Sequence, residues 1–197
     1  MEKFVGARRV VLGGVLLGLA AAASPIAVVD ARAEDPLVVF LLPENVTARW
    51  ESQDKPFFIE AMKKEFPEAK VRVDNALNDT SKQLAQAESA LASGAKVLVV
   101  TAIDQEGAAV IVNKAQEQGV PVIAYDRLIR NAPVAYYVSV DGLKIGEMQG
   151  SWLADNTEDG DRIAVINGST TDDNAHLFEN GYMSVLQPLF DNGTRTL

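Results

Sequence analysis

Short apolar runs alternate with segments of helical periodicity along most of the chain. Runs that are continuously apolar, or apolar at every second position, predict β-strands, and segments with apolar residues at helical spacing separate the first four of them. Because parallel strands need long crossover connections, this alternation predicts a doubly wound α/β domain whose helices cover both faces of a parallel sheet. The predicted strands are residues 37–42, 71–73, 97–101, 122–125 and 136–140.

The same alternation begins again after the fifth strand. Residues 142–153 and 175–190 have helical periodicity, and the apolar run 162–167 lies between them. Trp152 falls within the first of these patterns, which predicts a core position. One strand cannot form a sheet, so we expect a second lobe that is incomplete at Leu197, with apolar faces that leave it mobile or prone to association. The predicted parts are 1–33, 34–140 and 141–197.

The N-terminal segment has the order of features found in a secretory signal. Lys3, Arg8 and Arg9 form a positive region, a continuous apolar run follows at 10–23, and a small-residue cleavage pattern ends at Ala33. A membrane anchor is the alternative, but an apolar run of about 14 residues is shorter than the roughly 20 that a spanning helix needs. We therefore predict export to the periplasm with cleavage near Ala33, by a route that the sequence leaves open.

Composition argues against several classes of function. The formal charge of −9 and the lack of any Lys/Arg-rich stripe disfavour a nucleic-acid partner. Cysteine is absent, which excludes disulfides, thiolate metal ligands and a thiol nucleophile. The single histidine, His176, fits a helix surface better than a catalytic site, and no dinucleotide, phosphate-loop, metal or nucleophile-elbow motif is present. We expect no enzyme, no cofactor and no metal.

Polar residues follow the predicted strands at the point where each strand ends. The carboxyl ends of parallel strands share one edge of a sheet, and ligands bind in the crevice outside that edge. Carboxylates and amides accept hydrogen bonds from hydroxyls, arginines donate them, and an indole offers a flat apolar face to a sugar ring. The set therefore suits a neutral polyol, and its candidate members are Arg49, Trp50, Asp126, Arg127 and residues 172–174.

Each candidate also has a structural interpretation. Arg49 and Trp50 are equally consistent with a surface cation beside a core aromatic residue. Asp126 and Arg127 are equally consistent with a mutual ion pair that closes a loop. Asp and Asn favour the N-cap of a helix, so residues 172–174 are expected first of all to cap the helix that follows them.

Several motifs in the same order resemble the periplasmic substrate-binding proteins of ABC sugar importers, most closely the D-xylose-binding group. The similarity runs from about Leu37 to Leu197. Asp173 departs from the pattern, since relatives usually have Asn there, and His176 stands where Lys or Gly is common. The motifs are Arg49-Trp50-Glu51, Ala124-Tyr125-Asp126-Arg127-Leu128-Ile129, Tyr137-Val138-Ser139-Val140-Asp141 with Gly146-Glu147, and the segment from Asn167 to Phe178.

The resemblance implies two doubly wound lobes with one monosaccharide held between them. Position by position, it implies that Arg49, Asp126 and Arg127 in the first lobe, with Asp172 and Asn174 in the second, hydrogen-bond sugar hydroxyls, and that Trp50 lies beside the cleft. The remaining contacts of the second lobe would lie beyond Leu197.

The leading hypothesis is a non-enzymatic binding protein that delivers a xylose-like pentose to a membrane permease. Within the same fold, the alternative is a sensor that presents its closed form to a chemoreceptor or sensor kinase. A transcriptional repressor would begin with a helix-turn-helix, whereas this chain begins with a signal. From another class, a secreted glycosidase would use paired carboxylates such as Asp126 and Asp172.

Overall fold

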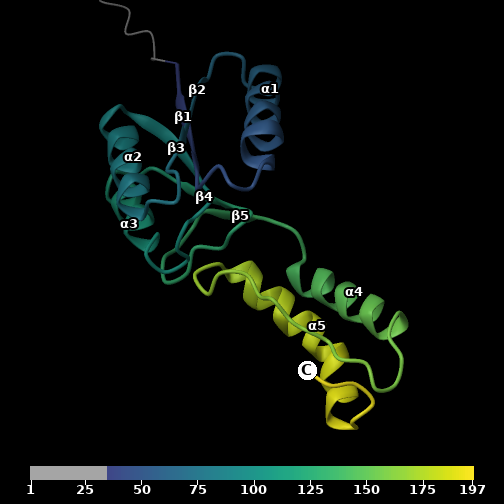
Figure 1. Cartoon of the computed structure of the whole chain (residues 1–197). Helices are drawn as coiled ribbons and strands as arrows, with labels where there is room; N and C mark the ends of the chain where they lie inside the picture. Colours follow the sequence, from purple (N-terminus) through teal and green to yellow (C-terminus); the bar gives the residue numbers. More distant parts are fainter. Residues whose placement is uncertain (1–34) are drawn as a thin grey trace, which may run out of the picture. The chain divides into compact units, whose positions relative to one another are not determined.

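The computed structural model describes residues 35–197. The predicted signal peptide and its cleavage site lie outside the described residues. Within this part of the chain, five strands form one sheet in the order β2-β1-β3-β4-β5, and every neighbouring pair is parallel. The predicted doubly wound α/β class is thereby confirmed (Figure 1). The strands are β1 (Leu37–Leu42), β2 (Lys70–Asn75), β3 (Ala95–Val100), β4 (Val122–Tyr125) and β5 (Tyr136–Val138).

The central strand β1 feeds two separate apolar clusters because its side chains alternate between the two faces of the sheet. Val39 and Leu41 pack with residues of α2 (Thr80–Ala92) and α3 (Ala109–Glu117) on one face. Val38, Phe40 and Leu42 face the opposite side, where partly buried side chains of α1 (Lys55–Glu65) cover them. Figure 1 shows α1 on one side of the sheet and α2 and α3 on the other. A strand buried on both faces is continuously apolar, which explains its sequence.

Helix boundaries agree with the expected capping chemistry. Asp79 is the N-cap of α2, where its side chain accepts a hydrogen bond from the Lys82 amide at 2.9 Å. Gly94 and Gly119 follow α2 and α3 with φ of +78° and +69°, a backbone conformation that glycine adopts without strain. Helical structure begins before α1, because a π-helical turn, η1 (Trp50–Asp54), precedes α1 without a break.

The second part of the chain is built around two helices, α4 (Gly142–Asp155) and α5 (Asp173–Asp191), which lie side by side (Figure 1). Gly142, Gly146 and Gly150 form a row along α4 because residues four apart share a helix face. Opposite this row, Gly181 of α5 comes so close that a Cβ atom on it would overlap the carbonyl oxygen of Leu143. Glycine therefore allows the two backbones to approach closely.

The prediction of a strand at 162–167 is wrong. The structure has only an isolated parallel bridge between Arg162 and Thr196, in which the Ile163 amide donates to the Thr196 carbonyl at 2.8 Å. A strand needs a neighbour with matching backbone donors and acceptors along its length, and within residues 35–197 this segment has one only at its start. Ile166 is accordingly 96% exposed.

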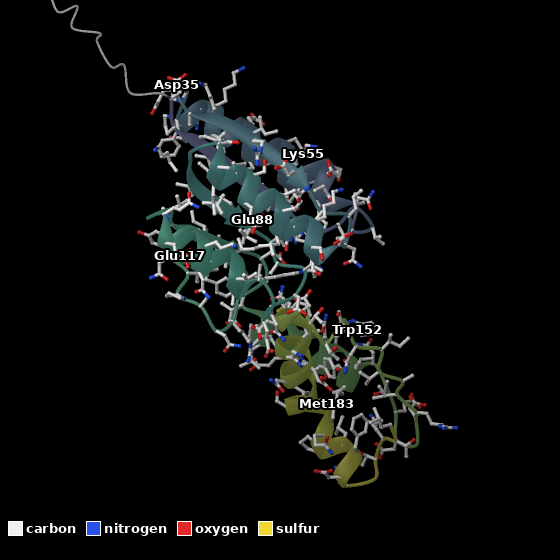
Figure 2. All side chains as sticks on the ribbon, turned by 90° about the vertical axis from the view of Figure 1, so that its left-hand side faces the viewer. Asp35, Lys55, Glu88, Glu117, Trp152 and Met183 are labelled. Carbon is white, nitrogen blue, oxygen red and sulfur yellow. The ribbon has the colours of Figure 1, made fainter. Side chains whose placement is uncertain are left out.

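The prediction that Trp152 (labelled in Figure 2) lies in the core is also wrong, because this residue is 64% exposed. At about 100° per residue, Trp152 lies roughly 120° around α4 from Gly146, the middle of the glycine row, and therefore falls outside the face that packs closely against α5. The glycine row, not the large apolar residues, forms the packed face of this helix. Among the helices of residues 35–197, none is long and apolar enough to cross a membrane.

Candidate functional site

Asp126 occupies a strained turn at the carboxyl end of β4. Its φ is +63°, and the Arg127 amide donates to the Tyr125 carbonyl at 2.7 Å, which closes a γ-turn around Asp126. The Asp126 amide donates to the carbonyl of Val138 in β5, also at 2.7 Å. Strained backbone of this kind persists only where surrounding contacts hold it, and it is concentrated at functional sites.

Four side chains converge on Asp126. Its carboxylate pairs with Arg49 through one oxygen and accepts from Asn174 Nδ2 at 3.0 Å through the other. Its carbonyl oxygen accepts from Ser139 Oγ at 2.7 Å and from the Tyr137 hydroxyl at 3.2 Å. Arg49, Asp126 and Asn174, which are far apart in sequence, therefore meet at the edge that the strand pattern predicted.

Arg49 is held in this position by two further contacts. Its Nε lies 3.3 Å from a carboxylate oxygen of Asp54, and its guanidinium carbon lies 4.2 Å from the centre of the Trp50 ring. Burial, the largest influence, lowers the pKa of Arg49, but the hydrogen bond and charge of Asp126 and the charge of Asp54 raise that pKa above its usual value. Arg49 therefore remains a charged donor, and its side chain is 45% exposed.

Trp50 is a core residue that supports the arginines and has little surface for a sugar. It is 2% exposed, and its Nε1 donates to Glu44 Oε1 at 2.6 Å. The guanidinium of Arg127 also lies over the ring, 5.9 Å from its centre. The sequence left open whether this aromatic residue lines the cleft or packs in the core, and in this structure it packs in the core.

Glu44 anchors the segment that carries Arg49 and Trp50. One of its carboxylate oxygens, Oε2, accepts hydrogen bonds from the backbone amides of Val46 and Thr47, and the bond from Thr47 measures 2.8 Å. Burial raises the pKa of Glu44, but these hydrogen bonds and the one from Trp50 outweigh it and hold the pKa below its usual value. Glu44 thus stabilises the backbone just after β1 and, through Trp50, the segment that carries Arg49.

Arg127 and Asp126 pair with other residues, so the mutual ion pair that the sequence left open as an alternative does not form. Arg127 Nε lies 2.9 Å from a carboxylate oxygen of Asp172, and Arg127 Nη1 donates to the Ala102 carbonyl at 3.3 Å. The other oxygen of Asp172 accepts from the Asn174 amide at 3.1 Å, so Asp172 is also the N-cap of α5. Capping and pairing with Arg127 occur in the same side chain.

Buried acceptors without a partner lie close to this network. In the described part of the chain, Asn174 Oδ1, Gln105 Oε1 and Thr101 Oγ1 are buried and make no hydrogen bond. A buried oxygen without a partner is costly, and a hydroxyl donor would satisfy it. The position of Thr101 at the end of a predicted strand was a signal in the sequence. Sequence analysis did not identify Gln105, or Asp54, which supports Arg49, as residues of the site, because only their neighbours in the folded chain distinguish them from other polar residues.

His176 lies on α5 as expected, partly buried, with Nε2 3.0 Å from the Thr170 carbonyl oxygen. Residues 35–197 contain no group of three or more His, Asp or Glu side chains placed to hold a metal ion. The geometry of the site is one of arginine donors alternating with carboxylate and amide acceptors. Such an arrangement can bind several hydroxyl groups at once.

Tyr125, which ends β4, gives this region a measurable pH response. Its hydroxyl donates to Asp54 Oδ1 at 2.6 Å, and burial together with that carboxylate raises the pKa of Tyr125 from 10.0 to about 12. A raised pKa stabilises the fold below pH 10, and this stability is lost as the pH rises toward 12. In a titration followed by tyrosinate absorbance, we expect Tyr125→Phe to remove the last transition and Asp54→Asn to shift it to lower pH. Ionisation of Tyr125 near pH 10 would contradict this arrangement.

Comparison with known proteins identifies the family. Residues 38–196 match the family described as the periplasmic binding protein domain. The chain belongs to this family. Among periplasmic binding proteins, the multiple sugar-binding periplasmic protein SbpA of Azospirillum brasilense is 38% identical over 170 residues, which cover 83% of this chain and 47% of SbpA. The D-xylose-binding periplasmic protein of Escherichia coli (strain K12) is 33% identical over 165 residues, 84% of this chain and 49% of that protein.

A solved structure supports the same assignment. An ABC transporter solute-binding protein from Clostridium phytofermentans with bound β-D-glucose matches with a TM-score of 0.76 and 30% identity, over 82% of this chain and 51% of that one. This periplasmic binding protein chain spans about half the length of the curated relatives it matches.

Proposed function

We propose that this chain provides the first lobe and part of the second lobe of a periplasmic component of an ABC importer that binds a monosaccharide. The observation that carries the proposal is the convergence of Arg49 and Asp126 with Asn174 at the carboxyl edge of the sheet. Residues 34–140 form the first lobe in this proposal and 141–197 the start of the second. The sugar binds where side chains of both lobes meet.

The proposed mechanism is recognition without bond cleavage. Arg49 and Arg127 donate to sugar oxygens. The carboxylates of Asp126 and Asp172 and the side-chain amide oxygen of Asn174 accept from sugar hydroxyls. In the structure, these groups also pair with one another, which fixes their geometry. Preorganised donors and acceptors lose less freedom on binding, which strengthens affinity.

The ligand we favour is a xylose-like pentose, since two relatives are named as D-xylose-binding periplasmic proteins. Export and removal of residues 1–33 would place the mature chain in the periplasm, where it would deliver the sugar to a membrane permease. Closure of two lobes around the ligand would exclude water from its hydrogen bonds.

Titration calorimetry with D-xylose and D-glucose tests this function. Because the relatives are about twice as long, the measurement is made on the 197-residue chain and on a version extended to their length. We expect sugar binding by the extended protein and weak binding, or none, by the shorter chain. If neither sugar binds the extended protein, the proposal fails.

A second arm distinguishes binding from hydrolysis. Incubation of the extended protein with a nitrophenyl xyloside should release no nitrophenol, and free xylose should be recovered unchanged. Release of nitrophenol that disappears in Asp126→Asn would instead favour the glycosidase hypothesis.

A further inference from the structure

The loop that precedes α5 is fastened to the loop after β3 by contacts outside the proposed sugar site. The Gln105 amide donates to the Thr171 carbonyl at 3.0 Å, and Gln105 Nε2 lies 3.3 Å from the Thr170 carbonyl oxygen. In addition, Thr171 Oγ1 donates to the carbonyl of Ile103 at 3.3 Å. These three bonds join the two predicted lobes without using the side chains of Arg49, Asp126, Arg127, Asp172 or Asn174.

An ion pair reinforces this contact. Arg130 Nε donates to Asp173 Oδ1 at 2.8 Å, and Arg130 Nη2 contacts the same oxygen. The Asp173 side chain is 3% exposed, whereas that of Arg130 is 49% exposed. The Arg130 amide donates to the Gln105 carbonyl at 2.6 Å, so the ion pair and the loop contact form one connected unit.

We propose that Gln105, Arg130, Thr171 and Asp173 form a latch that holds the first turn of α5 against the first lobe. Asp172 and Asn174 flank Asp173, so the latch keeps both in position for binding. Arg130 and Asp173 are therefore positioning residues. A protein that already populates its binding geometry loses less affinity to conformational change. The latch therefore contributes to affinity through the positions of Asp172 and Asn174, in addition to the bonds that the sugar itself makes.

The unequal burial of the two charges makes the latch testable. In Arg130→Gln, a buried carboxylate loses its cation, which strongly disfavours the docked state. In Asp173→Asn, the half-exposed Arg130 can turn to water, and the new amide oxygen can still accept from it. The double variant pairs two neutral amides, so it should dock better than Arg130→Gln alone.

Hydrogen exchange of the sugar-free 197-residue chain measures the docking directly. The Gln105 amide donates to the Thr171 carbonyl, and undocking of the loop before α5 breaks this hydrogen bond. We expect its exchange rate to rise at least roughly tenfold in Arg130→Gln and roughly threefold in Asp173→Asn, since hydrogen bonds to charged groups are the stronger ones. The double variant should exchange more slowly than Arg130→Gln.

Two controls separate local undocking from general instability. The Leu98 amide, which donates to the Pro121 carbonyl inside the first lobe, should exchange at the parent rate in every variant. Glu88→Gln, which removes the exposed ion pair with Lys114 on α2 and α3 (Glu88 in Figure 2), should leave the Gln105 amide unchanged.

The latch is overturned if Gln105 exchanges at the parent rate in Arg130→Gln, or if Leu98 accelerates equally, which would indicate a general loss of stability. A Gln105 amide that is unprotected in the parent chain would also overturn it. None of these results involves sugar, so they are independent of the outcome of the titrations above.

Discussion

Replacing Arg127 with alanine is expected to weaken sugar binding by roughly 2 to 4 kcal/mol, because a partly buried arginine makes charge-assisted hydrogen bonds that water does not replace. This corresponds to a loss of affinity of about 30- to 700-fold. The structure adds a second reason, since the substitution leaves Asp172 without the cation at 2.9 Å and the Ala102 carbonyl without its donor. Titration calorimetry on the protein extended to the length of its relatives measures the effect.

Matched variants define the role of the guanidinium. Arg127→Lys should recover only part of the affinity, because a single ammonium cannot contact Asp172, the Ala102 carbonyl and a sugar in the same geometry. Arg72→Ala should leave the affinity unchanged, since Arg72 pairs with Asp74 on its own strand, β2. Unchanged affinity in Arg127→Ala would show that this residue only pairs with Asp172.

Replacing Gly146 with alanine is expected to destabilise the α4–α5 pair by about 1 to 3 kcal/mol, the usual cost of overpacking. In an exposed helix the same change stabilises by up to about 1 kcal/mol, because alanine is the better helix former. Here a Cβ atom would overlap the Phe178 carbonyl oxygen and lie 2.8 Å from the Cα of Gly181. The contacting atoms belong to the backbone, so the helices must move apart.

Urea unfolding followed by circular dichroism measures this change, with Gln149→Ala on the exposed face of α4 as the control. Gly181→Ala should cost a similar amount, and the double variant should cost less than the sum because one separation of the helices relieves both overlaps. If Gly146→Ala is as stable as the parent, the close approach of the two helices contributes little to the fold.

The sheet and the helices that cover it show how closely a pattern of apolar residues can determine local structure. The sequence predicted the parallel sheet and the three helices that cover it, since the central strand is continuously apolar and the capping residues, such as Asp79 and Gly94, act through neighbouring backbone atoms. It also placed Arg49 and Asp126 at one edge, because parallel strands all end on the same side. These inferences need only local chemistry and the direction of the strands.

The second part depended on information that periodicity does not contain. The apolar run at 162–167 has the pattern of a strand, but strand formation requires a partner with free backbone groups. Within residues 35–197, Thr196 alone supplies one. The apolar pattern predicts a core position for Trp152, but α4 packs through its row of glycines. The close approach of the two backbones determines this contact, and the apolar character of the side chains does not.

Within the candidate site, the sequence by itself determined the kinds of groups that gather at the sheet edge, while only the tertiary structure decided how they pair. Asp126 and Arg127 are adjacent, but the γ-turn directs Asp126 to Arg49 and leaves Arg127 to Asp172. Which charges meet depends on distances between segments that are remote along the chain. Strand order and helix packing set those distances, and a linear pattern does not record them.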